Sequence, residues 1–330
     1  MTVCVVGSTG CVGRTLVPFL QGRGHRVRRG MRRPDGGADV VVLDLDDEAS
    51  LRPALAGCES AVFLVHGLAR GAGYDLWESR TATAFAHACR DVGVRRIVYL
   101  GGVVPAALPS TSTVVGRSGL VSQHLQSRVR TGALLRSEAT NVDVVELRAG
   151  MIVAADSASF VLARDLAARL PVIVRPPWLR SRQRPVALTD VCAAIDHALG
   201  GVAGVHGVAP GIYTCAGPDT VGGDEVLVAL GRLQGCRSRI IDVPAISHGL
   251  VAGVLGGFTR ASGDVVRELV MGMTDDLLGT DPDIFDTMPG HRRLSFEEAA
   301  RRALRTENSR VTFNAAVAER ALQVLSRRRR

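Results

Sequence analysis

Three glycines near the start of the chain have the spacing of a phosphate-binding turn. They lie in the segment VCVVGSTGCVG, residues 3–13, after four residues typical of a buried parallel strand. Gly7 permits a sharp turn, Gly10 lets backbone N–H groups approach a pyrophosphate, and Gly13 lets a helix and a strand pack closely. A helix over residues 14–21 would direct its positive end at the same phosphates. The predicted dinucleotide-binding residues of this turn are Gly7, Ser8, Thr9, Gly10, Cys11, Val12 and Gly13.

The second predicted strand ends in a basic loop. Residues 24–33 read GHRVRRGMRR, so this strand ends at Arg32 and Arg33, before the first acid, Asp35. The end of this strand is where a dinucleotide-binding fold meets the adenosine ribose. An acid there accepts hydrogen bonds from a free 2′-hydroxyl, whereas arginine there binds a 2′-phosphate. The order of residues therefore favours NADP(H) over NAD(H), the alternative being that both arginines only face solvent.

The elements that would position these residues alternate between strand and helix. We expect strands over residues 3–6, 24–33, 39–43, 60–65, 95–100 and 142–147, and helices over residues 14–21, 48–55, 75–92 and 120–139. Short connections between alternating elements predict an α/β fold with a Rossmann-type doubly wound parallel sheet. Asp44 and Leu45, directly after the third strand, would lie beside the adenine.

The pattern is less regular after about residue 155. We expect helices over residues 157–169, 189–199, 224–234, 296–305 and 314–325, and short strands near residues 186 and 212–215. This predicts an NAD(P)-binding Rossmann domain over residues 1–155 and a smaller, mostly helical substrate-binding lobe over residues 156–330. Residues 185–200 would return to the Rossmann core. The apolar segment 246–258 is too short to cross a bilayer and is interpreted as cleft lining or interface.

Composition restricts the class of protein and its chemistry. The chain has 330 residues, 46% of them hydrophobic, with no apolar run long enough for a membrane span and no basic leader, so we expect a cytoplasmic protein. The formal charge is +8, and all 40 basic residues are arginine. The absence of lysine excludes Schiff-base chemistry and a lysine-assisted tyrosine. The arginines are dispersed apart from residues 327–330, so we expect a solvated basic tail and no nucleic-acid partner.

Seven cysteines are scattered through the chain, and none forms a Cys-x-x-Cys pair. This pattern predicts neither a disulfide framework nor a metal site. Most of the cysteines are interpreted as small core residues. Cys11, inside the glycine turn, is either a reactive thiol near the cofactor or a tolerated small side chain.

Six segments resemble one known family. They are GSTGCVG at 7–13, LDL at 43–45, FLVHG at 63–67, GVRRIVYLGG at 93–102, ELRAGMIV at 146–153 and PVALTDV at 185–191. Over residues 1–235 the chain resembles atypical or extended short-chain dehydrogenases/reductases, especially the NmrA-like NAD(P)H-binding proteins. To the cofactor site the resemblance adds Arg32, Asp44, Leu45, Val65, His66 and Gly67, and we extend the site to Gly101 and Gly102 at the end of the fifth strand.

The resemblance also implies a proton-transfer set that this chain lacks. Such enzymes have a serine after the fifth strand and a Tyr-x-x-x-Lys on the next helix, in which the tyrosine transfers the proton. Gly101 and Gly102 stand where the serine is expected. His124 and Arg128 stand where the tyrosine and lysine are expected. The usual mechanism therefore does not carry over to this chain.

The spacing of the replaced pair is nevertheless retained. Residues four apart on a helix share a face, so His124 and Arg128 can both point towards the nicotinamide. Histidine titrates near neutral pH and can act as acid or base, whereas arginine can hold the ribose but keeps its proton. The pair is either a working replacement or the remnant of a site that lost proton transfer. Tyr74 is an alternative proton donor, and Ser110 or Ser112 could supply a hydroxyl near Gly102.

The leading functional hypothesis is an NADP-dependent oxidoreductase acting on a small, mostly apolar carbonyl or enone substrate. One alternative is an NADP(H)-binding regulatory or assembly protein without catalysis. Another is a non-redox epimerase, dehydratase or cyclase that uses the same pocket. We expect a small-molecule substrate and a monomer or homodimer.

Overall fold

A seven-stranded parallel sheet forms the centre of the computed structural model. The structure describes residues 1–67, 70–71, 73–105, 123–200, 207–236, 238–244, 263–271 and 275–310. The strand order is β11-β6-β5-β4-β1-β2-β3, with every neighbouring pair parallel. The strands are β1 Thr2–Val6, β2 Arg26–Met31, β3 Val40–Val42, β4 Ser60–Phe63, β5 Arg96–Gly102, β6 Asp143–Ala149 and β11 Gly211–Thr214. This order confirms the predicted Rossmann-type fold.

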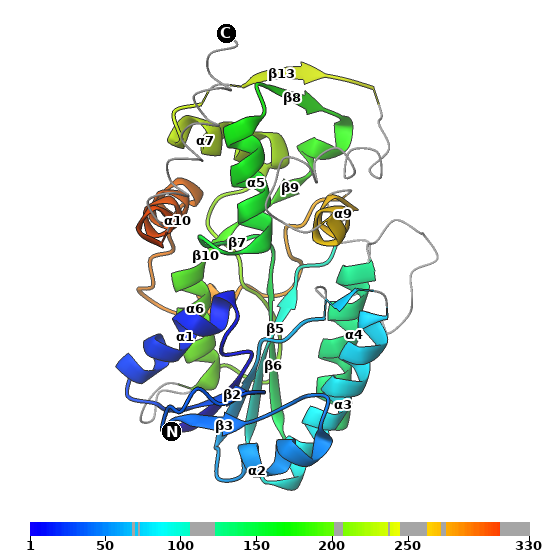
Figure 1. The fold of residues 1–330 in the computed structure, drawn as a ribbon, viewed down its shortest axis with the longest axis vertical. Helices are drawn as coiled ribbons and strands as arrows, with labels where there is room; N and C mark the ends of the chain where they lie inside the picture. Colours follow the sequence, from blue (N-terminus) through cyan, green and yellow to red (C-terminus); the bar gives the residue numbers. More distant parts are fainter. Residues whose placement is uncertain are drawn as a thin grey trace.

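Helices cover both faces of the sheet (Figure 1). One face is covered by α1 Cys11–Gly22 and α6 Leu188–Leu199, and the other by α2 Leu51–Leu55, α3 Tyr74–Asp91 and α4 Gln123–Glu138. Successive residues of a strand point to opposite faces, so a strand buried on both faces must be apolar throughout. In β1, Val3 and Val5 belong to one core and Cys4 and Val6 to the other. This explains why the first strand reads as an uninterrupted apolar run.

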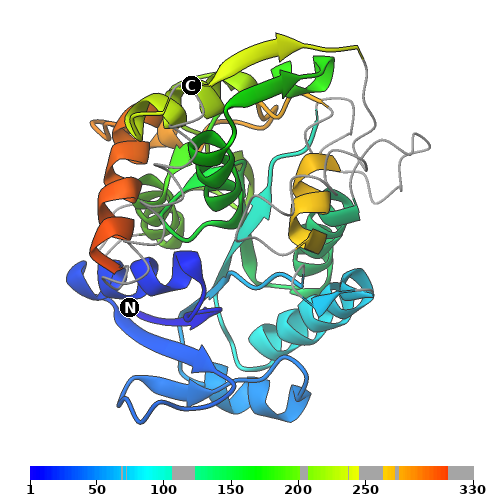
Figure 2. The same ribbon diagram turned by 45° about the horizontal axis from the view of Figure 1, so that its top comes forward.

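A second lobe lies beyond the carboxyl ends of the strands. Its helices are α5 Ala158–Arg169, α7 Gly223–Leu233, α9 Gly263–Met271 and α10 Phe296–Arg310, with the 3₁₀ turn η3 Pro177–Arg180. Three small strand pairs complete it: β7 Ile152–Val153 with β10 Val186–Ala187, β8 Val172–Arg175 with β13 Arg239–Asp242, and β9 Arg182–Gln183 with β12 Val221–Gly222. In both ribbon views α5 lies between α10 and α9 (Figures 1 and 2). The lobe has its own hydrophobic core.

Several element boundaries differ from those predicted. Helix α1 begins at Cys11, three residues before residue 14, because Gly10 is the N-cap with extended backbone. Residues 48–55 divide into the 3₁₀ turn η1 Glu48–Ser50 and the short α2. The chain returns to the sheet through α6, and β11 then adds the edge strand beside β6. The serines at 110 and 112, segment 246–258, the helix expected over 314–325 and the basic tail lie outside the described residues.

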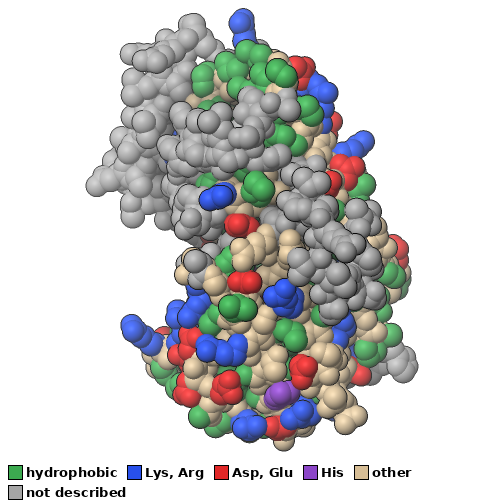
Figure 3. Space-filling model, turned by 90° about the vertical axis from the view of Figure 1, so that its right-hand side faces the viewer, with side chains coloured by type: hydrophobic (Ala, Val, Ile, Leu, Met, Phe, Trp, Pro, Cys, Tyr) green, Lys and Arg blue, Asp and Glu red, His purple; other side chains and the backbone are tan. Residues whose placement is uncertain are grey.

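The face of the molecule in Figure 3 carries both positive and negative side chains. Blue arginines and red acids alternate over the described lower half of this face, without gathering into one basic area. Within the described ranges, no helix is long and apolar enough to cross a membrane.

Candidate cofactor and active site

The glycine turn has the geometry of a phosphate cradle. Gly7 has φ 87°, a left-handed backbone conformation that favours glycine, and its carbonyl accepts a hydrogen bond from the N–H of Gly10 at 3.0 Å. A Cβ on Gly13 would overlap the carbonyl oxygen of Gly7 and lie 2.6 Å from the Cα of Ser8. Because the N-cap Gly10 has no side chain to cap the helix, the N–H groups of the first turn of α1 remain available to an anion. The turn therefore fits a pyrophosphate.

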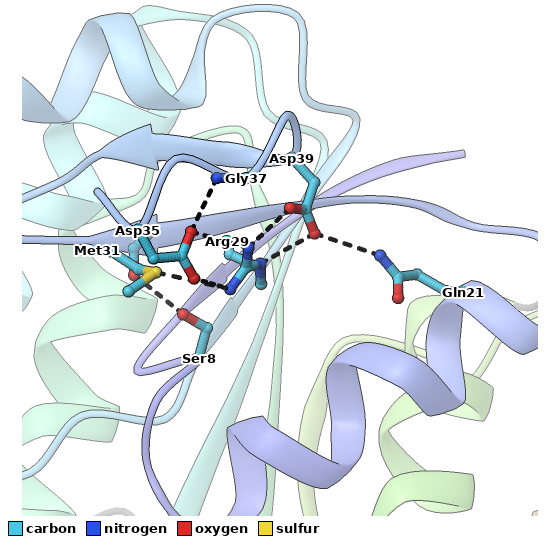
Figure 4. Close-up of polar contacts among 8 residues, drawn as sticks. Ser8, Gln21, Arg29, Met31, Asp35, Gly37 and Asp39 are labelled. Carbon is cyan, nitrogen blue, oxygen red and sulfur yellow. Dashed lines mark hydrogen bonds and ion pairs between the residues drawn. The ribbon is translucent and has the colours of Figure 1, made fainter. Parts of the chain in front are cut away.

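Two side chains of the glycine turn form hydrogen bonds with neighbouring parts of the chain. The Ser8 hydroxyl donates to the carbonyl of Gly30 at 3.2 Å and joins the turn to β2 (Figure 4). The Cys11 thiol donates to Asp156 Oδ1 at 3.0 Å, and Asp156 also pairs with Arg14. Since Asp156 lies just before α5, these contacts connect the turn to the second lobe.

Acids near the end of β2 are already paired with an arginine. The Arg29 guanidinium lies between Asp35 and Asp39, with N···O distances of 2.8 and 2.9 Å (Figure 4). These hydrogen bonds hold the pKa of both carboxyl groups below their usual range. Arg32 and Arg33 are exposed and make no hydrogen bond or ion pair with the described part of the chain. Both exposed guanidinium groups lie directly after β2, the strand whose end meets the adenosine ribose in this fold.

Other predicted cofactor residues have structural contacts in this structure. Asp44 Oδ1 accepts a hydrogen bond from the N–H of Asp46 at 3.0 Å, and Leu45 is buried in the core beside α2. Val65 packs against the same core. Gly67 packs closely against α3, because a Cβ there would lie 3.0 Å from the Cβ of Tyr74.

A cavity of about 600 Å³ connects the glycine turn with the second lobe. It opens at the carboxyl ends of the strands, next to the point between β1 and β4 where the strand order reverses, as the fold predicts. The predicted residues that line it are Gly7, Gly10, Cys11, Val12, Gly13, His66, Gly101, Gly102, His124 and Arg128. The predicted residues that are not among its described lining are Ser8, Thr9, Arg32, Arg33, Asp44, Leu45, Val65, Gly67 and Tyr74.

Two histidines face each other in the cavity. The rings of His66 and His124 have centroids 6.2 Å apart and planes at 74°. Burial lowers the pKa of His66 to about 4 and that of His124 to about 3, and the positive charge of Arg128 lowers both further. The His66 side chain is exposed at the cavity, and the protein atoms around it partly desolvate the ring. The expectation that His124 titrates near neutral pH is therefore corrected: both rings are neutral at pH 7.

His124 has one unsatisfied ring nitrogen. Its Nδ1 is buried and has no hydrogen-bond partner in the part of the chain that the structure describes. Its backbone N–H donates to Glu268 Oε2 at 3.2 Å, which joins the start of α4 to α9. A buried polar atom without a partner destabilises the folded state. The His124 side chain also lines the cavity.

Arg128 is fixed at the end of β5. Its guanidinium donates to the carbonyl of Leu100 and lies over the Tyr99 ring, 5.5 Å from the centroid. The Tyr99 hydroxyl donates back to the carbonyl of Arg128 at 3.1 Å. A Cβ on Gly102 would lie 3.7 Å from Arg128 Cγ, so the glycine at the expected serine position lies against this arginine.

Tyr74 lies at the start of α3 and is buried. Its hydroxyl has no hydrogen-bond partner among the described residues. Burial raises the pKa of Tyr74, and the neighbouring carboxylates of Glu268 and Glu78 raise it further. The phenol is consequently a weaker acid than free tyrosine, and its role as proton donor stays a prediction.

Two acidic residues at the site, Glu78 and Glu268, were not identified from the sequence. Glu78 on α3 is 3% exposed and accepts hydrogen bonds from the Gly67 N–H and the Ser127 hydroxyl. Glu268 lines the cavity beside His124. Helical spacing contained a signal for Glu78, because it shares a buried face with Ala82 and Phe85. In the described residues, no group of three or more histidine, cysteine or acidic side chains could hold a metal.

The sheet order and the glycine turn define a fold of the Rossmann class. Residues 7–166 match the family described as NAD(P)H-binding. The predicted resemblance to NAD(P)H-binding proteins is confirmed over that segment. No curated protein matches the chain.

Solved structures with the same fold have low sequence identity to this chain. The triphenylmethane reductase of Citrobacter sp., complexed with NADP(H), has a TM-score of 0.67 at 17% identity, covering 92% of this chain and 100% of its own. A human epimerase family protein with NADPH has 0.64 at 20%, covering 94% and 100%. The UDP-glucose 4-epimerase of Thermus thermophilus, complexed with NAD, has 0.63 at 18%, covering 94% and 100%. At these identities the likeness establishes the fold.

Proposed function

We propose that this protein is an NADP(H)-dependent oxidoreductase that reduces an apolar carbonyl or enone substrate. The observation that supports it best is the continuity of one cavity from the phosphate cradle, past the paired histidines, to the second lobe. Nucleotide and substrate would then meet at the ends of β5 and α4. The nucleotide-bound neighbours of the same fold include a reductase with NADP(H).

Each part of the nucleotide has residues suited to it. The backbone of residues 7–13 would hold the pyrophosphate, and Arg32 and Arg33 would bind the 2′-phosphate. Gly101 and Gly102 leave the end of β5 open for the nicotinamide end. In this proposal cofactor binding belongs to residues 1–155, and substrate binding belongs to the lobe that follows.

Neutral His124 would orient the substrate and polarise its oxygen. A neutral imidazole N–H can donate a hydrogen bond to a carbonyl oxygen, and His124 lines the cavity where that oxygen would lie. Arg128 adds fixed positive charge on the same side of the cavity, which stabilises an oxygen that becomes more negative. A bound NADPH would supply hydride-transfer chemistry at this end of the cavity, and the substrate oxygen held by His124 and Arg128 would take its proton from water.

The test is NADPH oxidation over a panel of apolar ketones and enones. We expect His124→Ala to lower kcat/KM by about 10²-fold or more, which is the usual contribution of a group that acts on a reacting atom. NADPH affinity should change much less. Unchanged turnover would remove the proposed role of His124.

His87→Ala is the matched control. His87 lies on α3, outside the described cavity lining, with its ring 39% exposed and paired with Glu138 at 3.0 Å. We expect this variant to retain the activity of the parent protein. A similar loss in both variants would indicate general damage to the α3–α4 pair.

A regulatory NADP(H)-binding protein is the second candidate. It is favoured by the absence of the Ser-Tyr-Lys set and by the low pKa of both cavity histidines. Tight NADPH binding, no turnover on the panel and recovery of a specific protein partner would support it. Product formed without net NADPH consumption would instead indicate a non-redox enzyme such as an epimerase.

A further inference from the structure

The part of the cavity inside the second lobe has a different chemical character from the cofactor end. We call it the lobe chamber; it is lined by side chains of α5, β8, η3, α7 and α9. Its principal wall residues are Leu162, Leu166, Ile173, Trp178, Leu227 and Leu269. Apolar groups therefore form most of the surface that a substrate would contact.

Charged groups in the chamber are few and unsuitable for phosphates. Glu268 is the charged residue among the described side chains that line the chamber. Its carboxylate would repel an anion. The N-terminus of α7 reaches the chamber at Gly223, and the Glu225 carboxylate in its first turn already accepts a hydrogen bond from the N–H of Gly222. Arg128 remains bound at the end of β5. A nucleoside diphosphate would lose its hydration here without finding cationic partners.

Hydrocarbon, in contrast, is stabilised by such walls. Each methylene group moved from water to an apolar site gains about fourfold in affinity, from the usual transfer free energy per methylene. The imidazole of His124, which lines the cavity, provides a polar group at the cofactor end. The site thus pairs one hydrogen-bonding point with an extended apolar volume.

We propose that the lobe chamber binds the hydrocarbon body of a neutral lipophilic ketone or enone, whose oxygen lies against His124. The chamber excludes sugar nucleotides by charge. This assignment rests on the proposed oxidoreductase function for the reacting group, but binding of the hydrocarbon body can be measured without turnover.

Straight-chain 2-alkanones of increasing length are suitable probes. With the full-length protein saturated in NADPH, we expect the dissociation constant to fall by about fourfold per added methylene until the chamber is filled. Trp178 lines the chamber, so its fluorescence should change on binding. UDP-glucose should neither bind nor compete with the ketones.

Two neighbouring residues of α7 provide a matched pair of variants. Leu227 is 7% exposed and lines the chamber, whereas Val228 is 44% exposed and faces outward. Leu227→Trp should weaken long ketones at least 10-fold while leaving NADPH affinity unchanged, and Val228→Trp should alter neither. Leu227→Ala enlarges the chamber and should move the optimum to longer ketones, which keeps the test decisive if the tryptophan variant does not fold.

The outcomes separate the two proposals. Affinity that rises with chain length, without NADPH oxidation, supports the lipophilic chamber and rejects the oxidoreductase. Turnover of ketones with no dependence on chain length supports the oxidoreductase and overturns the chamber. Competitive binding of UDP-glucose also overturns it.

Discussion

Glu78 on α3 accepts a hydrogen bond from the backbone N–H of Gly67, directly beside the cavity residue His66. Its second carboxylate oxygen accepts a hydrogen bond from the Ser127 hydroxyl on α4, three residues after His124. One buried carboxylate therefore joins the two segments that present the facing histidines. The separation of these rings depends on a residue that contacts neither of them in the described hydrogen bonds.

We expect Glu78→Ala to destabilise the protein and loosen the site. Loss of the carboxylate leaves two buried donors without acceptors, each costing about 1–3 kcal/mol. Glu78→Gln keeps one acceptor oxygen and should recover part of the loss. Urea unfolding and NADPH titration measure both effects.

The control for Glu78 is Glu138→Ala. Glu138 pairs with His87 in a half-exposed ion pair, and such pairs contribute about 0–1 kcal/mol. Equal destabilisation by Glu78→Ala and Glu138→Ala would show that Glu78 has no special positioning role.

Replacement of Arg32 and Arg33 by alanine should reduce the preference for NADPH. Charge-assisted hydrogen bonds to a 2′-phosphate contribute enough for a loss of about 10- to 100-fold in NADPH affinity. NADH, which lacks that phosphate, should bind as before. Equilibrium titration of both nucleotides gives the ratio directly.

Arg26→Ala is the control for this prediction, since Arg26 is exposed at the opposite end of the same strand, β2. It should leave both affinities unchanged. If the Arg32 and Arg33 variants weakened NADPH and NADH equally, the arginines would have no role in recognising the 2′-phosphate.

Acid should destabilise the protein through the two cavity histidines. Their pKa values of about 4 and 3 in the folded protein lie below the ordinary value of 6.5, so the unfolded chain binds protons that the folded chain excludes. Stability from these groups is complete above pH 6.5 and decreases as the pH falls towards 4. His124→Asn should reduce this slope in urea unfolding measured from pH 7 to pH 4.5.

The same pKa values predict a pH-rate profile without a histidine inflection near pH 6.5. His87→Asn serves as the control for the stability slope, because His87 lies outside the described cavity lining. An inflection near pH 6.5 that disappears in His124→Asn would contradict the neutral state assigned to His124.

The parts of this molecule that depend on local sequence patterns could be predicted from the sequence. The spacing of Gly7, Gly10 and Gly13 and the apolar run of β1 determine the turn and its strand. The fold class followed from the alternation of elements. No pattern in the sequence places His66 against His124. These two residues are 58 positions apart, and the packing of α3 against α4 brings their segments together.

Contacts between segments far apart in the sequence also explain where the structure differs from the sequence-based predictions. The lowered pKa of His124 results from its position under the second lobe, which no local pattern indicates. Strand β8 has only four residues, and its partner β13 lies more than sixty residues later. A pairing of that kind has no signal in either segment alone.

Gly13→Ala should abolish tight NADPH binding and destabilise the protein, whereas Gly22→Ala in the same helix should do neither. A Cβ at Gly13 meets the backbone of Gly7 and Ser8, which cannot move without opening the cradle. A Cβ at Gly22 meets nothing within 4 Å, and alanine there stabilises through the unfolded state by about 0.4–1 kcal/mol. NADPH titration and thermal unfolding of both variants check this pair. Full NADPH affinity in Gly13→Ala would mean that the phosphates bind elsewhere.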